Sequence, residues 1–353
     1  MTGPPTVSPH RVGPYRLLSR LGGGGMGEVF LGRSPGGRPV AVKVVRAELA
    51  ADPRFRKRFA AEVEAARKVG GFYTAQLVDS DTGAERPWLA TAYIPGPSLH
   101  EVLEMRAALP LASVAVLGAG LAEGLAAIHH CGLVHRDLKP ANVILADDGP
   151  RVIDFGIARA LDATSTSMTR TVIGTPGFLS PEQARGREVG PRSDVFALGC
   201  LLALASSGTP PFGTGPTEAV VYRVVHEEPD LEGVPSALTP LVRRCLAKKA
   251  ADRPGLERVL SRLNALAGQE GGTEAGGWLP DDVTEVIRAR TTRVATSALL
   301  TLDRDDARGA PGAGGSSEEE AFWEVRQEAA AQAECDEVRR TGPGPEARHR
   351  RVG

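Results

Sequence analysis

The sequence predicts an α+β fold made of two lobes: a small, mainly antiparallel β lobe with one helix, and a larger, mainly helical lobe. Two observations predict it. Short alternating apolar stretches come first along the chain, and apolar residues at helical spacing follow from residue 111 onward. The 353 residues suffice for one such two-lobed unit with additional segments. The content of 42% hydrophobic and 24% charged residues is typical of globular proteins.

The β lobe begins with a glycine-rich flap. Residues 15–18 are typical of a first strand. A G-x-G-x-x-G-x-V motif follows, at Gly22, Gly24, Gly27 and Val29. Glycines suit a loop whose backbone amides approach phosphates closely or whose φ is positive. A dinucleotide-binding turn requires a helix directly after the glycines, but residues 28–31 alternate like a strand and lead to another at 40–45. The pattern favours a strand–loop–strand flap over a nucleotide.

A lysine lies inside the apolar strand at 40–45. Burying an unpaired ammonium group is costly, so Lys43 is expected to have anionic partners. A helix is predicted at 53–67 and a strand at 88–94, before the helical lobe begins. There, residues 111–131 predict a long helix, and the most apolar stretch, 195–205, predicts a buried core helix.

The most informative segment is His135-Arg136-Asp137-Leu138-Lys139-Pro140-Ala141-Asn142, followed by Asp154-Phe155-Gly156. In phosphoryl transfer the protein mainly positions groups and neutralises charge. Asp137 is suited to accept the proton of an attacking hydroxyl, and Lys139 to reach the transferring phosphate. Asn142 and Asp154 are suited to hold Mg²⁺. The apolar residues 152–153 predict a short strand that supports Asp154.

These motifs resemble the catalytic signature of protein kinases over about residues 13–266. The resemblance is closest to bacterial, particularly actinobacterial, serine/threonine protein kinases of the eukaryotic-like type. It implies a small lobe at about 13–91 and a large lobe at about 95–266. It also implies transfer of the γ-phosphoryl group of ATP to serine and threonine hydroxyls of proteins, with Mg²⁺ as the metal and Mn²⁺ able to substitute.

The resemblance implies which residues contact ATP. They are Leu21, Gly22, Gly23, Gly24, Gly25, Met26, Gly27, Val29, Ala41, Lys43, Thr91, Ala92, Ile94, Asn142 and Asp154. It also implies an ion pair between Lys43 and Glu62, because related kinases show Phe-x-x-Glu where this chain has Phe59-Ala60-Ala61-Glu62.

The hinge between the lobes resembles that of kinases with a small gatekeeper. Aligned on Tyr93, Thr91 is the gatekeeper, which predicts an open back pocket. Ala92 stands where an acidic residue is common. Adenine is therefore expected to bind through backbone groups of Ala92 and Ile94.

A hydroxyl-rich stretch at 162–175 resembles the activation segment. A phosphate carries about −1.5 to −2 charges and can order a segment by pairing with arginine. With Arg136 next to the catalytic base, we expect autophosphorylation at Thr169 and Thr171. Thr175 resembles the threonine that hydrogen-bonds the catalytic aspartate and lysine in serine/threonine kinases.

Three residues resemble the structural supports of the kinase fold. Glu182, in Ser180-Pro181-Glu182, is expected to form a buried ion pair with Arg253, whose loss typically costs a few kcal/mol. Asp194 opens the apolar helix and is expected to hold the backbone of the catalytic loop.

Composition argues against several other classes. A net charge of −1 gives no support for binding nucleic acid or an anionic membrane. Cys131, Cys200, Cys245 and Cys335 form no C-x-x-C pair and are expected to be reduced thiols. Adjacent histidines on a helix face different ways, so His129 and His130 are expected to pack or to face solvent. His135 is likewise expected to be a packed scaffold residue.

No membrane insertion is expected. The first 14 residues lack the apolar core of a signal peptide. The stretch at 195–205 is far shorter than the ~20 residues that cross a bilayer. We therefore expect a cytoplasmic protein.

The remaining segments are predicted from composition. Residues 1–12 are expected to be disordered, and 267–277 to form a linker. Residues 278–300 predict a capped helix that either docks on the helical lobe or recruits a partner. Residues 301–353 are expected to be a low-complexity, charged and largely disordered tail. Autophosphorylation could involve a transient kinase dimer.

Two alternative functions fit the sequence less well. Small-molecule phosphotransferases of kinase-like fold lack the Gly-Thr-Pro…Ser-Pro-Glu segment that this chain has at 174–182. A pseudokinase acting as a scaffold would require the loss of Lys43, Asp137 or Asp154, and all three are present.

Overall fold

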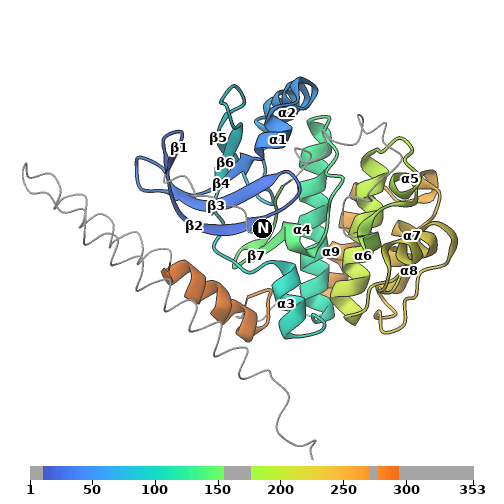
Figure 1. Ribbon diagram of the computed structural model, residues 1–353. Helices are drawn as coiled ribbons and strands as arrows, with labels where there is room; N and C mark the ends of the chain where they lie inside the picture. The colour runs from blue at the N-terminus through green and yellow to red at the C-terminus, as the bar shows by residue number, and fades with distance from the viewer. Residues whose placement is uncertain (1–10, 155–175, 270–276, 294–353) are drawn as a thin grey trace, which may run out of the picture. The chain divides into compact units, whose positions relative to one another are not determined.

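The computed structural model describes residues 11–154, 176–269 and 277–293 (Figure 1). All of them belong to one compact unit, Met1–Ala298. The residues Thr169, Thr171 and Thr175 lie outside the described residues. So do residues 1–10, the tail at 301–353 and most of the predicted linker.

Six antiparallel strands form the sheet of the small lobe, in the order β1-β2-β3-β4-β6-β5. They are β1 (Arg11–Val12), β2 (Tyr15–Gly23), β3 (Gly27–Arg33), β4 (Pro39–Val45), β5 (Leu77–Asp81) and β6 (Trp88–Ala92). Because side chains alternate along a strand, Val40, Val42 and Val44 enter one buried cluster, while Ala41 and Lys43 line the cavity described below.

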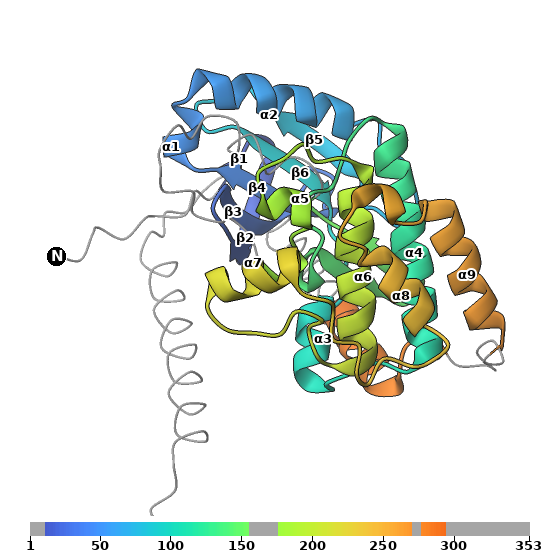
Figure 2. The ribbon, with the colours of Figure 1, turned by 90° about the vertical axis from the view of Figure 1, so that its right-hand side faces the viewer.

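Two helices follow β4, α1 (Ala47–Ala50) and α2 (Pro53–Ala66). The Asp52 side chain caps α2 by accepting from the Arg54 amide at 2.8 Å. Figure 2 shows α2 beside β5. Arg56 fastens the helix to the β5–β6 turn, since its guanidinium donates to the Ala84 carbonyl at 2.9 Å. The small lobe is thus one sheet with one long helix, as predicted.

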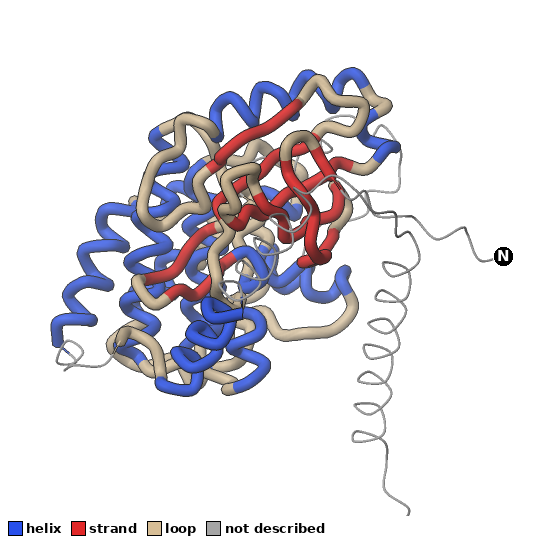
Figure 3. The backbone as a smooth tube through the Cα atoms, turned by 90° about the vertical axis from the view of Figure 1, so that its left-hand side faces the viewer, coloured by secondary structure: helices blue, strands red, loops and turns tan. Residues whose placement is uncertain are grey.

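The large lobe is mainly helical (Figure 3). Its helices are α3 (Leu99–Met105), α4 (Leu111–His130), α5 (Pro181–Ala184), α6 (Pro191–Ser207), α7 (Thr217–His226), α8 (Thr239–Cys245) and α9 (Leu256–Gln269). Short 3-10 turns lie at η1 (Pro140–Asn142), η2 (Pro176–Phe178) and η3 (Ala250–Asp252), and β7 (Val143–Ala146) pairs with β8 (Gly149–Val152). A Cβ on Gly118 of α4 would lie 2.7 Å from Leu202 of α6 and 2.8 Å from Leu263 of α9. A glycine therefore lets these three helices pack closely.

A second apolar segment, α4, bears on the expectation of no membrane insertion. Helix α4 is long and apolar enough to cross a membrane by length and composition, and it is the one such helix among the described residues. Its apolar residues are buried, however, including Val114, Leu117, Leu121 and Leu125. It packs against α6, α9 and β8. In this structure α4 is the central helix of the helical lobe.

A further helix, at 281–293, follows α9 along the chain. It lies beside α3 (Figure 1, orange). Leu279, Val283 and Ile287 are buried in the main core, and the Trp278 indole N–H donates to the Ala146 carbonyl of β7 at 2.9 Å. The sequence left open whether residues 278–300 dock on the helical lobe or recruit a partner. The described part of this segment docks on the helical lobe.

Candidate active site

A cavity of about 710 Å³ opens between the two lobes, which is within the usual size of ligand pockets. It is bounded by β2, β3, β4 and β6 from the sheet, by the hinge at 93–98, and by the segment 137–154 of the helical lobe. Every residue expected to contact the nucleotide lines this cavity, and so do Asp137 and Lys139. Glu62 does not line it. Lining residues that the sequence reading missed are Leu89, Tyr93, Gly96, Ser98, Glu101, Ala141, Ile144, Ile153 and Arg290.

The glycine flap turns tightly between β2 and β3, where the Gly24 amide donates to the Gly27 carbonyl at 2.9 Å. None of the glycines at 22–27 has a positive φ. A Cβ on Gly27 would lie 2.1 Å from the Val44 carbonyl oxygen, so the closeness of β4 excludes a side chain. At Gly22, Gly24 and Gly25 a Cβ would meet open space, which leaves the flap backbone accessible to a ligand.

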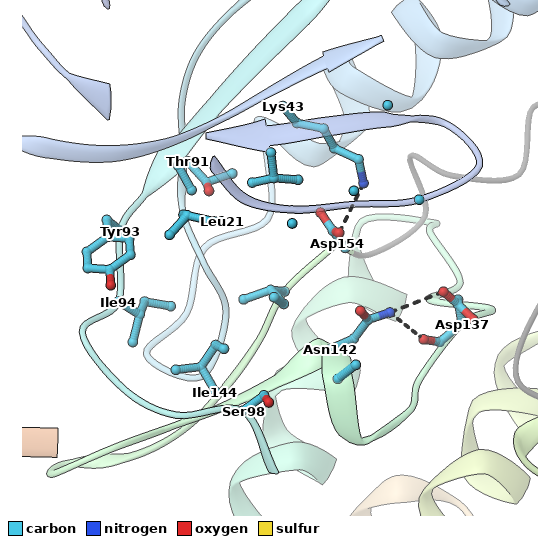
Figure 4. Close-up of a pocket in the computed structure, with 18 of the residues that line it drawn as sticks. Leu21, Lys43, Thr91, Tyr93, Ile94, Ser98, Asp137, Asn142, Ile144 and Asp154 are labelled. Atoms are coloured by element: carbon cyan, nitrogen blue, oxygen red, sulfur yellow. Dashed lines mark hydrogen bonds and ion pairs between the residues drawn. The ribbon is translucent and has the colours of Figure 1, made fainter. Parts of the chain in front are cut away.

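The catalytic loop directs two side chains onto Asp137. The Lys139 ammonium group donates to Asp137 Oδ2 at 2.8 Å. The Asn142 amide donates to the Asp137 carbonyl oxygen at 2.8 Å and to Oδ2 at 3.2 Å (Figure 4). The carboxylate is therefore held in one orientation, and the Asp137 side chain is 30% exposed.

Lys43 has a different partner from the one expected. Its ammonium group lies 3.0 Å from Asp154 Oδ2 (Figure 4), and no ion pair joins it to Glu62 in the described part of the chain. Glu62 Oε2 is buried without a hydrogen-bond partner among the described residues. Burial raises the pKa of Glu62 to about 7, although the nearby Arg136 and Arg58 guanidinium groups lower it. The expected Lys43–Glu62 pair is thus not formed in this structure.

The unpaired carboxyl group predicts a pH-dependent stability. Between pH 4.5 and 7 the unfolded chain releases the Glu62 proton while the folded protein keeps it, so this group's contribution falls as pH rises. We expect the Glu62→Gln variant to have the same free energy of unfolding as the wild type at pH 4. At pH 8 its free energy of unfolding should be higher than that of the wild type by roughly 2 to 3 kcal/mol. Urea unfolding at both pH values measures this. Glu64→Gln, on an exposed position of the same helix, is the control, and a gain that does not change with pH would contradict the assignment.

Two residues of the site have a left-handed backbone. Arg136 has φ 67° and Asp154 has φ 57°, values that non-glycine residues rarely adopt. Such conformations persist where the surroundings enforce them. For the catalytic loop, Asp194 enforces it: its two carboxylate oxygens each accept a hydrogen bond at 2.8 Å, from the His135 and Arg136 amides. The predicted support of the loop backbone by Asp194 is present.

A histidine that the sequence reading set aside takes part in this support. His129 Nε2 lies 2.7 Å from Asp194 Oδ2, and so ties α4 to the start of α6. His135 is buried, and burial lowers the pKa of its imidazole, although Asp194 and Asp137 oppose the shift. Its Nδ1 accepts from the Asp137 amide at 3.3 Å, and Nε2 lies 3.2 Å from the Ile153 carbonyl. His135 thus links the loop to the strand end that carries Asp154.

The predicted ion pair of Glu182 and Arg253 is formed. Two guanidinium nitrogens of Arg253 donate to the two carboxylate oxygens of Glu182, at 2.6 and 2.8 Å, and Ser193 Oγ donates at 2.6 Å. Burial alone would raise the pKa of Glu182, but the hydrogen bonds from Arg253 and Ser193 bring it down to about 2. The neighbouring Gln183 side chain donates to the Arg136 carbonyl at 2.8 Å. The segment that the Glu182–Arg253 ion pair holds in place therefore also supports the catalytic loop.

The residues present fit a magnesium ion shared with phosphates. Asn142 uses its amide nitrogen for Asp137, so its amide oxygen is the ligand atom, and Asp154 has a second carboxylate oxygen besides the one on Lys43. Mg²⁺ commonly binds one or two such oxygens together with substrate phosphates. Groups of three or more His, Cys, Asp or Glu suited to a metal are absent from the described residues.

Comparison with known proteins agrees with this geometry. The chain is 50% identical to the probable serine/threonine-protein kinase PkwA of Thermomonospora curvata, over 82% of this chain and 38% of that protein. It is 50% identical to the serine/threonine-protein kinase AfsK of Streptomyces coelicolor, over 80% of this chain and 36% of that protein. The chain therefore spans little more than a third of the length of these relatives. A stretch covering 82% of 353 residues runs past about residue 280 wherever it starts, so the match to PkwA reaches the start of the 281–293 helix.

Solved structures give the same fold. The kinase domain of Mycobacterium tuberculosis PknI superposes with a TM-score of 0.55 and 27% identity, covering 75% of this chain and all of that one. The model of the protein kinase domain family matches residues 15–263. With the predicted α+β fold and kinase resemblance both confirmed, the chain belongs to the protein kinase family.

Proposed function

We propose that this chain is an active serine/threonine protein kinase that transfers the γ-phosphoryl group of ATP to protein hydroxyls. The observation that carries the proposal is the convergence of Lys43, Asp137, Lys139, Asn142 and Asp154 on one cavity. Relatives named serine/threonine-protein kinases favour it over a small-molecule phosphotransferase. The presence of all five side chains favours it over a scaffold without activity.

The geometry supports a division of labour among these residues. Asp137, oriented by Asn142, accepts the proton of the substrate hydroxyl, and Lys139 stabilises charge on the transferring group. Lys43 holds the nucleotide phosphates. Asn142 and Asp154 would hold Mg²⁺, which would neutralise phosphate charge, and Mn²⁺ could replace it.

The hinge supports adenine binding through the backbone. The Ala92 amide already donates to the Gln76 carbonyl at 2.9 Å. Adenine is therefore expected to use the Ala92 carbonyl together with the Ile94 backbone. Thr91 lines the cavity as the gatekeeper.

Activation is proposed to follow phosphorylation of Thr169 and Thr171, with Thr175 contacting Asp137 and Lys139. Arg136 supports this, because its Nε is buried without a hydrogen-bond partner among the described residues. A transient dimer would allow one copy to phosphorylate the other. We propose that the domain acts on cytoplasmic proteins and that the tail at 301–353 binds a partner.

Phosphate incorporation from labelled ATP with magnesium tests the function. The wild type is expected to label itself and a generic protein substrate on serine and threonine, with the self-label mapping by mass spectrometry to Thr169 or Thr171. The label should require the metal and should be absent from Asp137→Asn. A wild type that binds ATP but labels neither itself nor the substrate would overturn the proposal.

A further inference from the structure

The nucleotide cavity receives one side chain from outside the residues that the protein kinase family model matches. Arg290 lines the cavity, yet it belongs to the helix at 281–293 and the family model ends at residue 263. Its side chain is 32% exposed. It therefore stands at the mouth of the cavity, partly covered by the residues that it contacts.

Arg290 donates hydrogen bonds to two residues at the end of the hinge, Gly96 and Glu101. One guanidinium nitrogen donates to the Gly96 carbonyl at 2.9 Å, and the other to Glu101 Oε1 at 2.6 Å. The second oxygen of Glu101 accepts from the Ser98 amide at 2.7 Å and from Ser98 Oγ at 2.9 Å. One arginine thus fixes a carbonyl and a carboxylate that both line the cavity. Glu101 in turn fixes Ser98, so a single chain of hydrogen bonds orders this edge.

The backbone at Gly96 packs closely against β7. A Cβ on Gly96 would lie 2.0 Å from the Leu145 carbonyl oxygen. The next residue, Pro97, accepts from the Leu145 amide at 2.9 Å. The hinge therefore packs against β7 and also accepts a hydrogen bond from Arg290.

The helix that carries Arg290 is itself anchored. Val283 and Ile287 are buried in the core, and the Asp282 carboxylate lies 2.7 Å from a guanidinium nitrogen of Arg106, the residue that follows α3. Arg290 can thus act as a fixed group and not as a mobile surface cation. The pKa of Glu101 is lowered: burial opposes the shift, but hydrogen bonds from Arg290 and Ser98 outweigh it.

The position of this edge indicates what it meets. If the base binds at Ala92 and Ile94 and the phosphates lie near Lys43, the sugar falls between them, beside Ser98 and Glu101. A bare Glu101 carboxylate there would repel a triphosphate, and Arg290 neutralises it. We propose that Arg290 is a positioning residue for ATP, which orders the sugar-side edge of the cavity and neutralises Glu101. This inference rests on the proposed use of ATP.

Direct binding of Mg·ATP to the full chain, measured by calorimetry, tests this without requiring phosphoryl transfer. Arg290→Ala is expected to weaken binding about tenfold, as loss of a hydrogen-bonded charge pair would. The KM for ATP should rise equally, with kcat within twofold of the wild type. Arg290→Lys keeps the charge but not the fork of donors, and should recover only part of the affinity. Arg288→Ala is the matched control, because it removes an arginine from an exposed position of the same helix that does not line the cavity, and it should bind as the wild type does.

Several outcomes would overturn the proposal. Wild-type affinity in Arg290→Ala, tighter binding in Arg290→Ala, or equal weakening in Arg288→Ala would each do so. In a Glu101→Gln background the Arg290→Ala change should have a smaller effect, and full additivity would count against coupling through Glu101. A wild type that binds ATP but transfers no phosphate would sink the proposed activity and leave this inference standing.

Discussion

The Asp137→Asn variant is expected to transfer phosphate about 10²- to 10⁴-fold more slowly than the wild type, the range typical of losing a general base. An amide cannot accept the hydroxyl proton, yet it keeps the size of the carboxylate and can still accept from Lys139. The affinity for Mg·ATP should stay close to wild type, because Asn142 and Asp154 are unchanged. Steady-state kinetics on a protein substrate, combined with nucleotide binding, separates the two quantities.

The control for that experiment is Asp147→Asn. Asp147 is exposed in the turn between β7 and β8, away from the cavity, so its loss should not change kcat. A kcat for Asp137→Asn within about fivefold of the wild type would be far smaller than general-base catalysis normally contributes. It would remove Asp137 from the role of base.

Loss of Arg253 is expected to lower the free energy of unfolding by about 3 to 5 kcal/mol, because it leaves a buried charge unpaired. The Arg253 side chain is fully buried, and Glu182 is 13% exposed. Urea unfolding of Arg253→Ala at pH 7 measures the change. Arg20→Ala removes an exposed pair with Glu28 and should cost less than about 1 kcal/mol.

The same pair gives a pH dependence with a definite sign. The folded-state pKa of Glu182 is about 2, below its ordinary value of 4.5. A lowered carboxyl pKa contributes stability above pH 4.5 and loses it as pH falls through 2. The wild type should therefore lose up to roughly 3 kcal/mol more than Glu182→Gln over that window. Parallel stability curves for the two proteins would show that the pair does not hold Glu182 ionised.

Local motifs made most of the cavity predictable. The glycine flap, Lys43 and the catalytic loop are short segments whose residue types and spacing follow from phosphate chemistry, and the fold brings all of them to one place. The Glu182–Arg253 pair was also predictable, because both residues lie in motifs of the family.

What the sequence did not reveal depends on long-range packing. Arg290 reaches Gly96 across 194 positions of the chain, and no local pattern distinguishes it from a solvent-exposed arginine. His129 looked like a packing residue because its partner, Asp194, lies on another helix. Whether Lys43 meets Glu62 or Asp154 depends on where α2 rests against the sheet, which spacing along the chain does not determine.

Asp194 joins the catalytic loop to the helical lobe, because the loop is bonded to α6 through Asp194, which also contacts His129 of α4. Lys43 belongs to the sheet of the small lobe instead. The 3.0 Å ion pair between Lys43 and Asp154 therefore bridges the two lobes across the cavity, and any widening of the cavity would have to break it. A pair of spectroscopic probes, one on the sheet and one on α6, would measure in solution whether the two lobes separate.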